Sequence, residues 1–441
     1  MDFIKKHLQV FFLFFFGLII RLSIIFVDYS WDVNNHMVWA KDFLTRGPQN
    51  FYETQSSNVF ANLTPNYPPL AIFTFVVMRL FSPLIHNFYW WLNIRIPLIP
   101  SDVIFFLEKI VFLAGLMKIP AILADLGIAF LIFLFAKKII PKNKKNQIIA
   151  VSLVLFNPVF IYNSGLWGQI DSIPIFFVLS SVYLLLNTRR SIISTILFTL
   201  ALLVKPTALV FLPVYIILFI KKFGIKKSIL NLFIANIIFC LFFLPFTKDK
   251  NIFLYPYQIY LNKILAAQSL PFVTNGAFNL WVLITGMKGI KDVAPFLLGV
   301  SYRIFGYMIV GFINIFVILC LIKSKKITED FFIALFINAF AAFLFLTKMH
   351  ERYSLLPLVF LLLFSLKKTK FISWFVLLSV ISLLNHYHSW AVPRIELFVA
   401  VIGSVPFVYI ISSINIIIFF YLFKSSFFLS IFSRPRALTI K

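Results

Sequence analysis

An acid and an imidazole stand four residues apart in the first long polar stretch of the chain, Trp31 to Leu70. On a helix Asp32 and His36 would lie on one face, because side chains three and four residues apart are neighbours there. Two aromatic residues, Trp39 and Phe43, continue the same face. A carboxylate can take a proton from a hydroxyl group, and an imidazole can orient that carboxylate or bind a phosphate. We therefore regard Asp32 as a candidate general base and His36 as a candidate substrate ligand.

Other interpretations of Asp32 stay open from the residues alone. An acid in the first turn of a helix is also typical of a cap or of a solvated side chain, because the helix N-terminus favours negative charge. Asp28 lies one turn earlier and is the alternative acid. Tyr67 leads into Pro68-Pro69, whose fixed φ angles predict an extended or kinked segment before the next apolar run. An amphipathic helix lying on a membrane surface would present Asp32 to water.

Further side chains able to bind an anion or a sugar lie in later polar segments. Lys205 stands between two short apolar stretches, where a charge must face protein, water or an anion. Arg352 and His350 could bind a phosphate, or they could pair with the neighbouring Glu351. The remaining candidates could bind a sugar, or could serve as turn and helix-cap residues: Gln169, Asp171, Asn275, Asn279 and Trp281.

Composition identifies the class of protein. Of the 441 residues, 61% are hydrophobic and 12% are charged, whereas a soluble domain carries about 25% charged residues. The mean hydropathy is +0.97, so we expect an all-α polytopic membrane protein. The net charge of +25 comes from basic clusters between apolar runs, which is typical of cytoplasmic loops and not of nucleic-acid binding. Cys240 and Cys320 lie in apolar runs, and we expect neither a disulfide nor a metal site from them.

The basic residues also predict the orientation of the chain. The first apolar run follows Lys5 and Lys6, is too long for a cleaved signal and lacks a small-residue cleavage site, so we expect a retained span with a cytoplasmic N-terminus. That assignment places residues 28–70 outside, as a large first external loop. The later basic clusters can then all lie inside, and the opposite loops collect the candidate residues described above. These clusters are Lys137 to Lys145, Arg189-Arg190, Lys221 to Lys227, Lys323 to Lys326 and Lys367 to Lys370.

The alternation of apolar and basic segments predicts a bundle of about 12 to 14 transmembrane helices, forming a single domain over residues 1–441. Two segments leave alternatives open. Leu70 to Pro83 could cross the bilayer or only dip into it, and Val103 to Ala136 could be one span or two. The run from Ser191 to Ile220 should divide at Lys205-Pro206 into two short helices. Asp125 lies within an apolar run, and we expect it to pair with another polar group inside the bundle.

Taken in order, several short motifs resemble those of the GT-C membrane glycosyltransferases. They are DVNNHMVWA from Asp32, Tyr67-Pro68-Pro69, the segment Ile119 to Asp125, Asn157-Pro158 followed by WGQIDS, Lys205-Pro206, AFNLW from Ala277 and MHERY from Met349. The pattern is most similar to prokaryotic mannosyltransferase-like proteins related to the second GPI mannosyltransferase. It is more distantly similar to the endoplasmic-reticulum glucosyltransferases that extend the dolichol-linked oligosaccharide.

The resemblance implies an integral-membrane hexosyltransferase, with mannose as the favoured sugar. The donor would be a polyprenyl- or dolichyl-phosphate sugar, and the acceptor a lipid-linked glycan or another glycan, glycolipid or protein at the cell surface. Transfer would invert the anomeric carbon on the outer face of the plasma membrane in a prokaryote, or on the lumenal face of the endoplasmic reticulum in a eukaryote. No nucleic acid is expected as a partner.

The resemblance also assigns roles to residues. The acid of the first external loop, the general base in such families, corresponds to Asp32, and the Gln of a later external turn corresponds to Gln169. Asp171 stands where the glucosyltransferases have Asn. The His-Glu-basic cluster of these families corresponds to His350, Glu351 and Arg352. Many members carry two acids at the first site, but here Trp31 precedes Asp32. A paired-acid metal site is therefore not supported, and no cofactor is assigned, although a divalent metal stays open.

The assigned chemistry agrees with the residue types. Lys205 and Arg352 could stabilise the negative charge that gathers on a departing lipid phosphate. No nucleotide-binding glycine motif is present in the sequence, so a nucleotide-sugar donor is not expected. The alternative from another class is a secondary transporter or lipid flippase, because Asp125 and Lys205 would also suit a substrate path through the membrane. The absence of an inverted repeat favours the transferase. A transferase acting on protein is the alternative among enzymes.

Overall fold

The computed structural model describes residues 2–61, 64–96, 99–266, 270–324 and 327–428. The structure is 76% helical, and the strands within those ranges are four segments of two or three residues. Eight of the described helices are long and apolar enough to cross a membrane, judged by length and composition, and three apolar helices are shorter. The prediction of an all-α polytopic membrane protein is confirmed.

The described residues pack as two compact units. Unit 1 comprises the segments Met1–Leu209, Phe223–Leu270 and Trp390–Pro393. Unit 2 comprises Val210–Lys222, Pro271–Ser389 and Arg394–Lys441. The expectation of a single domain stays a prediction.

The regular elements of unit 1, within its described residues, are helices. Its elements before the Lys205 break are α1 (Asp2–Leu22), α2 (Trp31–Arg46), α3 (Pro69–Arg95), α4 (Ser101–Glu108), α5 (Ile110–Ile139), α6 (Lys144–Leu155), α7 (Pro158–Ile161), the π-helix η1 (Tyr162–Trp167), α8 (Ser172–Asn187) and α9 (Ser191–Val204). After the break come η2 (Pro206–Phe211), whose last two residues belong to unit 2, the second half of α10 (Leu212–Phe243), η3 (Leu244–Phe246), α11 (Leu254–Ile259) and the π-helix η4 (Tyr260–Leu265).

Proline and glycine set the main boundaries of these helices. α9 ends at Lys205, and the short 3-10 helix η2 begins at Pro206, so the predicted division at this dipeptide is confirmed. α10 contains Gly224 with a φ of 78°, a value that no helical residue adopts, and the chain therefore turns there between two helical halves. The segment Val103 to Ala136, for which one or two spans stayed open, contains one candidate span, α5, and the short helix α4 before it. The two helices are separated at Lys109, whose ψ is 143°.

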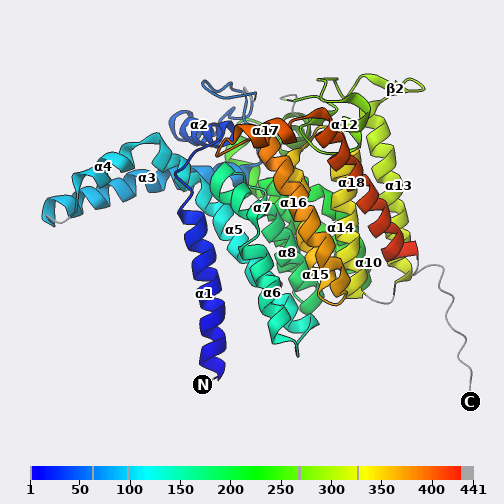
Figure 1. Ribbon diagram of the computed structural model, residues 1–441. Helices are drawn as coiled ribbons and strands as arrows, with labels where there is room; N and C mark the ends of the chain where they lie inside the picture. Colours follow the sequence, from blue (N-terminus) through cyan, green and yellow to red (C-terminus); the bar gives the residue numbers. More distant parts are fainter. Residues whose placement is uncertain (1, 62–63, 97–98, 267–269, 325–326, 429–441) are drawn as a thin grey trace, which may run out of the picture. The chain divides into compact units, whose positions relative to one another are not determined.

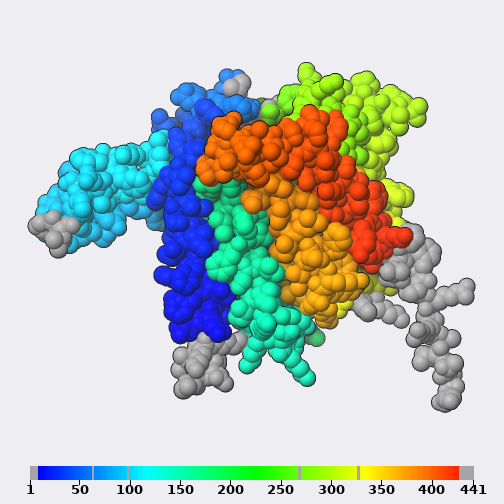
Figure 2. All heavy atoms as spheres, viewed as in Figure 1, coloured from blue at the N-terminus to red at the C-terminus, as the bar shows by residue number. Residues whose placement is uncertain are grey.

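Helices α3 and α4 form an apolar arm of unit 1. α3 begins directly after Pro68, with Pro69 at its first position, where a proline lacks no hydrogen bond. The helix then runs without interruption to Arg95, so the Leu70 to Pro83 segment is part of a longer helix than the sequence suggested. Figure 1 shows α3 and α4 running across the direction of α1, and Figure 2 shows them, in light blue to cyan, projecting from the rest of unit 1. Leu84 and Phe88 are exposed on this arm, as lipid-facing side chains would be.

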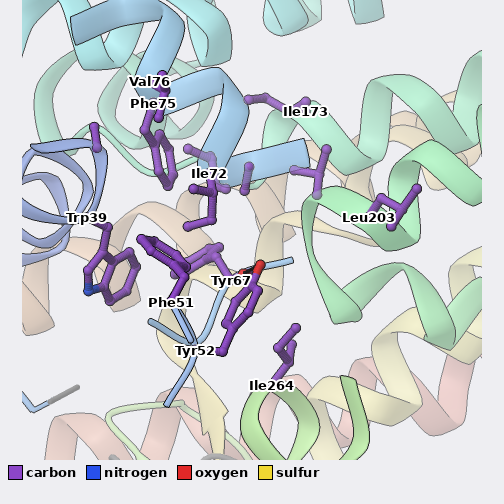
Figure 3. Close-up of a cluster of buried hydrophobic side chains, with 14 of the residues drawn as sticks. Trp39, Phe51, Tyr52, Tyr67, Ile72, Phe75, Val76, Ile173, Leu203 and Ile264 are labelled. Atoms are coloured by element: carbon purple, nitrogen blue, oxygen red, sulfur yellow. Dashed lines mark hydrogen bonds between the residues drawn. The ribbon is translucent and has the colours of Figure 1, made fainter. Parts of the chain in front are cut away.

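A core rich in aromatic side chains fills the space beside α2 and α3. Trp39 of α2 and Tyr67 belong to it, and their ring centroids lie 5.6 Å apart. Figure 3 shows Phe51 and Tyr52, from the loop after α2, gathered with them. Tyr52 is fully buried and donates its hydroxyl to the carbonyl of Tyr67 at 3.1 Å. Burial raises the pKa of Tyr52 well above its usual value. The core therefore fixes the loop between α2 and α3 against both helices.

Unit 2 combines apolar helices with two pairs of short strands in its described residues. Its elements are the first half of α10, β1 (Thr274–Asn275), α12 (Leu280–Thr285), β2 (Pro295–Leu297), β3 (Val300–Ser301), α13 (Tyr302–Lys323), α14 (Ile327–Phe345), β4 (Met349–His350), η5 (Glu351–Leu355), α15 (Leu358–Ser365), η6 (Thr369–Phe371), α16 (Ile372–Ser389), α17 (Glu396–Ile402), α18 (Val405–Phe423) and the π-helix η7 (Lys424–Phe428). β1 pairs with β4 in parallel, and β2 pairs with β3 antiparallel.

Candidate active site

Asp32 lies in the first turn of α2, half-buried in unit 1. Ser30 caps this helix, accepting a hydrogen bond from the backbone N–H of Val33 at 3.4 Å. The carboxylate of Asp32 is therefore close to the positive end of the helix dipole. Its Oδ2 accepts a hydrogen bond from Nε2 of Gln169 at 2.7 Å. Two residues that the sequence singled out separately thus meet in the structure.

Gln169 reaches Asp32 because a glycine precedes it. Gly168 follows the π-helix η1 with a φ of 82°, in the left-handed region that glycine adopts without strain. A Cβ at this position would lie 2.4 Å from Cγ2 of Val33, so a larger residue could not approach α2 as closely. Gln169 is fully buried, and its Oε1 has no hydrogen-bond partner within the described part of the chain. The amide therefore offers an acceptor beside the Asp32 carboxylate.

Asp171 and Lys205 form a buried ion pair, also in unit 1. Nζ of Lys205 lies 2.6 Å from Oδ1 of Asp171, and their side chains are 4% and 0% exposed. The same Nζ lies 5.9 Å from the centroid of the Tyr67 ring, on which a cation is attracted to the π-electrons. The carboxylate of Asp171 therefore provides the ion-pair partner that a buried lysine requires. A donor phosphate bound here would contact a cation that is already paired.

His36 is buried among aromatic rings. It stacks on Phe75 at a centroid distance of 4.0 Å and meets the edge of Tyr67 at 5.4 Å. The imidazole is 0% exposed, so access to it from outside would require this core to open. Tyr67 therefore lies near both His36 and Lys205.

A second group of candidates lies in unit 2. Asn275 in β1 is paired in register with His350 in β4. Nη1 of Arg352 donates to Oε1 of Glu351 at 3.1 Å, and Nδ1 of His350 lies 3.9 Å from Oε2 of the same carboxylate. Glu351 is 4% exposed and Arg352 7% exposed. The acid and the two bases therefore pair with one another, which is one of the two arrangements that the sequence left open.

Asn279 and Trp281 make structural contacts in unit 2. The side chain of Asn279 caps α12, accepting from the backbone N–H groups of Trp281 and Val282. Trp281 is fully buried and donates its indole N–H to the carbonyl of Phe345 at 3.0 Å. These hydrogen bonds show that Asn279 serves as a helix cap. Sugar binding by Asn275, Asn279 or Trp281 stays a prediction.

Two buried cations in unit 1, Arg21 and Lys118, are not among the candidates identified from the sequence. Arg21 of α1 donates from Nε to Oδ2 of Asp125 at 2.9 Å, and Ser164 and Ser172 donate to the same carboxylate. The prediction that Asp125 pairs inside the bundle is confirmed. Lys118 of α5 donates to three backbone carbonyls. Both cations lie inside apolar runs, and that position is the signal that could have identified them.

The loop between α2 and α3 is tied to the segment after α10 by a carboxylate. Glu53 accepts from the hydroxyl of Tyr255 at 2.9 Å and pairs with Nζ of Lys250 at 2.6 Å. Burial and the neighbouring Glu53 raise the pKa of Tyr255.

Within the residues that the structure describes, no group of three or more His, Cys, Asp and Glu side chains could hold a metal ion.

The comparisons with known proteins agree with the resemblance at the level of class. The model of the ALG3 protein family matches residues 130–263, which is less than half of the chain. This stretch includes Gln169, Asp171 and Lys205 and excludes Asp32 and the cluster at His350. No curated protein matches the sequence. ALG3 proteins are dolichyl-phosphate mannosyltransferases of the GT-C type, so the match supports a membrane glycosyltransferase, and a mannosyltransferase in particular.

Proposed function

We propose that this protein transfers a hexose, mannose most of all, from a polyprenyl- or dolichyl-phosphate donor to a lipid-linked glycan or cell-surface acceptor. Transfer takes place on the external or lumenal face and inverts the anomeric carbon. The observation that carries the proposal is the hydrogen bond between Gln169 and Asp32. It brings the acid of the first external loop against a residue of the stretch that matches a mannosyltransferase family.

Asp32 acts as the general base in this mechanism. The acceptor hydroxyl attacks the anomeric carbon as the bond from that carbon to the phosphate oxygen breaks, and the departing lipid phosphate keeps the electron pair. The hydroxyl proton passes to the Asp32 carboxylate. A single displacement of this kind inverts the anomeric centre. General-base assistance typically accelerates such a step by about 10² to 10⁴-fold.

Gln169 holds the base and orients the nucleophile. Its Nε2 donates to Oδ2 of Asp32, which fixes the carboxylate, while the Oε1 of the same amide has no partner in the described residues. A buried acceptor of this kind is costly to leave unsatisfied, so a substrate hydroxyl that donates to it would be bound favourably. The acceptor sugar therefore contacts Gln169 and Asp32 together in our mechanism.

The donor phosphate requires positive charge. In unit 1 the candidate is Lys205, and in unit 2 the candidates are Arg352 and His350. Lys205 and Arg352 are each held by a carboxylate, those of Asp171 and Glu351. We propose that the donor phosphate binds at one of these two pairs, since a buried ion pair keeps the cation desolvated and in place. The negative charge on the leaving phosphate grows during transfer, so the cation that binds it stabilises the transition state more than the ground state.

The decisive experiment measures transfer with purified protein in lipid nanodiscs. A panel of polyprenyl phosphates carrying mannose, glucose or galactose would be supplied with lipid-linked glycan acceptors, and products would be identified by mass spectrometry. We expect consumption of the mannose donor and an acceptor heavier by one hexose. A parallel reaction with a chelator tests for a divalent metal, and a peptide acceptor tests for protein glycosylation. Movement of intact donor or solute across sealed vesicles, with no glycosidic bond formed, would instead favour the transporter.

A further inference from the structure

Lys118 is the feature of unit 1 that the proposed mechanism leaves unused. It lies within α5 and is 0% exposed, and its Nζ is close to three main-chain carbonyl oxygens. The Nζ donates to the carbonyls of Ile25 at 2.8 Å, Asp28 at 2.6 Å and Leu166 at 2.8 Å. A lysine ammonium has three N–H donors. All three are therefore used on backbone oxygens, and none is left to contact a substrate.

The three carbonyls belong to the two segments that carry the candidate catalytic residues. Ile25 and Asp28 lie between α1 and α2, just before Asp32, and Leu166 lies in η1, just before Gln169. Leu166 lies in the last turn of η1, and carbonyls at the C-terminal end of a helix carry partial negative charge that attracts a cation. The Lys118 ammonium therefore donates hydrogen bonds to carbonyl oxygens of both segments and holds the two segments close together.

Other contacts at the same junction show how close the two segments are. Ser30 donates its hydroxyl to the carbonyl of Trp167 at 3.1 Å. The stem of Lys118 passes close to Gly168, where a Cβ would lie 3.1 Å from Cγ of the lysine. The distance between Asp32 and Gln169 therefore depends on a junction in which Lys118 is the charged, central member.

We propose that Lys118 is a positioning residue that sets the alignment of Asp32 with Gln169 by holding the two segments through their carbonyls. The inference rests on the proposed function only in naming Asp32 as the base. The contacts that hold the two segments together do not depend on the reaction. Without the ammonium, three buried carbonyls would lose their donor and the segments would separate. A shift of about 1 Å at a catalytic group can lower turnover by about 10²-fold.

The chain offers a matched control for removing this lysine. Lys221, in unit 2, also donates through Nζ to three backbone carbonyls, those of Leu321, Ile322 and Ser324. Lys118→Met and Lys221→Met would therefore remove the same kind of contact, in the first case beside the candidate base and in the second at the end of α13. Hydrogen exchange of backbone amides, measured by mass spectrometry in nanodiscs, reports the result without any substrate.

We expect Lys118→Met to raise exchange in residues 25–34 and 163–171, and to lower kcat by about 10²-fold with a donor KM close to that of the wild type. Lys221→Met should leave both segments and kcat unchanged. Lys118→Arg, which keeps the charge and the donors, should recover much of the loss. Lys118→Gln keeps two N–H donors without charge, and replaces Lys118→Met if that variant does not fold.

The outcomes separate this inference from the proposed function. Wild-type exchange in both segments of Lys118→Met or Lys118→Gln would overturn the positioning role, whatever the reaction proves to be. Equal losses of kcat in Lys118→Met and Lys221→Met would also overturn it, since the effect would then be one of general stability. A wild-type protein that transfers no sugar would refute the proposed function, and the exchange measurement would still decide the role of Lys118.

Discussion

Gln169 donates a hydrogen bond to Asp32 across a separation of 137 residues, at a distance of 2.7 Å. The contact joins the start of α2 to the turn that follows η1, and it places a neutral amide with one unpartnered oxygen, counted over the described residues, beside a half-buried carboxylate. A general base needs both a fixed direction and access to the proton that it removes. The relationship between these two residues therefore provides the most direct tests of the proposed mechanism.

Replacing Asp32 with Asn should abolish most of the activity while leaving donor binding intact. The substitution keeps the size of the side chain and removes its basicity, so we expect kcat to fall by about 10²-fold or more. Asp28→Asn is the matched control, because Asp28 is exposed and its side chain accepts only from the adjacent backbone N–H of Tyr29 among the hydrogen bonds described. Single-turnover kinetics with donor binding measured separately would check this. Loss of activity in Asp28→Asn alone would transfer the role of base to that residue.

Gln169→Glu should shift the pH dependence of the reaction. The change places a second carboxylate at hydrogen-bond distance from Asp32, and repulsion between two like charges so close raises one of the two apparent pKa values of the pair. The base acts in its deprotonated form, so the acid limb of the kcat profile should move to higher pH, with activity recovering as the pH rises. Gln147→Glu, at a buried glutamine in α6, serves as the control and should leave the limb where it is. An unchanged profile in Gln169→Glu would argue against contact between the two side chains during catalysis.

Much of this arrangement could be predicted from the sequence, because it depends on local spacing and on motif order. The helix that carries Asp32 follows from its aromatic and polar periodicity, and the break at Lys205-Pro206 follows from the missing N–H of proline. The pairing of Asp125 also follows, because a charge inside an apolar run requires a partner. The sequence could not name that partner, Arg21, since the contact is made by packing between helices 104 residues apart.

The parts that could not be predicted are those in which a polar residue has two reasonable partners. Lys205 could have faced a ligand or a carboxylate, and the fold gives it Asp171. Asn279 could have bound a sugar or capped a helix, and the structure shows the cap. Spacing along the chain cannot decide between such alternatives, because the choice depends on distances set by tertiary packing.

Gly168→Ala should destabilise the protein and separate Asp32 from Gln169. An alanine at a φ of 82° is strained, by about 1 to 3 kcal/mol, and its Cβ would also lie 2.4 Å from Val33. Gly47 has a φ of 77° and a ψ of 178°, a conformation at least as unfavourable for alanine, and a Cβ added there would have no neighbour within 4 Å. Gly47→Ala therefore introduces backbone strain without a close contact to α2. We expect a larger loss of kcat in Gly168→Ala than in Gly47→Ala. Similar losses of kcat in the two variants would mean that close approach to α2 is not required.

The orientation predicted from the basic clusters can be tested by labelling. In a background lacking Cys240 and Cys320, single cysteines would replace the exposed residues Gln55, Leu298 and Asn143. Cysteines at positions 55 and 298 should react with an impermeant thiol reagent added outside sealed cells, and a cysteine at position 143 should react only after the membrane is opened. Reaction at position 143 in intact cells would reverse the inside–outside assignment.

The ion pair between Lys205 and Asp171 changes what a single substitution can show. From the sequence alone, Lys205→Ala would be expected to weaken donor use and leave the protein folded. In the structure it would strand a carboxylate that is 0% exposed, and breaking a buried pair in this way typically costs about 3 to 5 kcal/mol. We therefore expect Lys205→Ala to lower the thermal stability markedly, so that lost activity would have two explanations.

A double variant separates the two effects. Lys205→Met with Asp171→Asn leaves no unpaired charge, and we expect it to recover most of the stability lost in Lys205→Ala. If Lys205 binds the donor phosphate, the double variant should still raise the donor KM by about tenfold to 100-fold, since a charged hydrogen bond is worth about 1.5 to 3 kcal/mol. Asp171→Asn alone keeps the cation, so it should retain donor affinity despite reduced stability. A stable double variant with the wild-type KM would instead make the pair a purely structural one, and the donor phosphate would then have to be bound without Lys205.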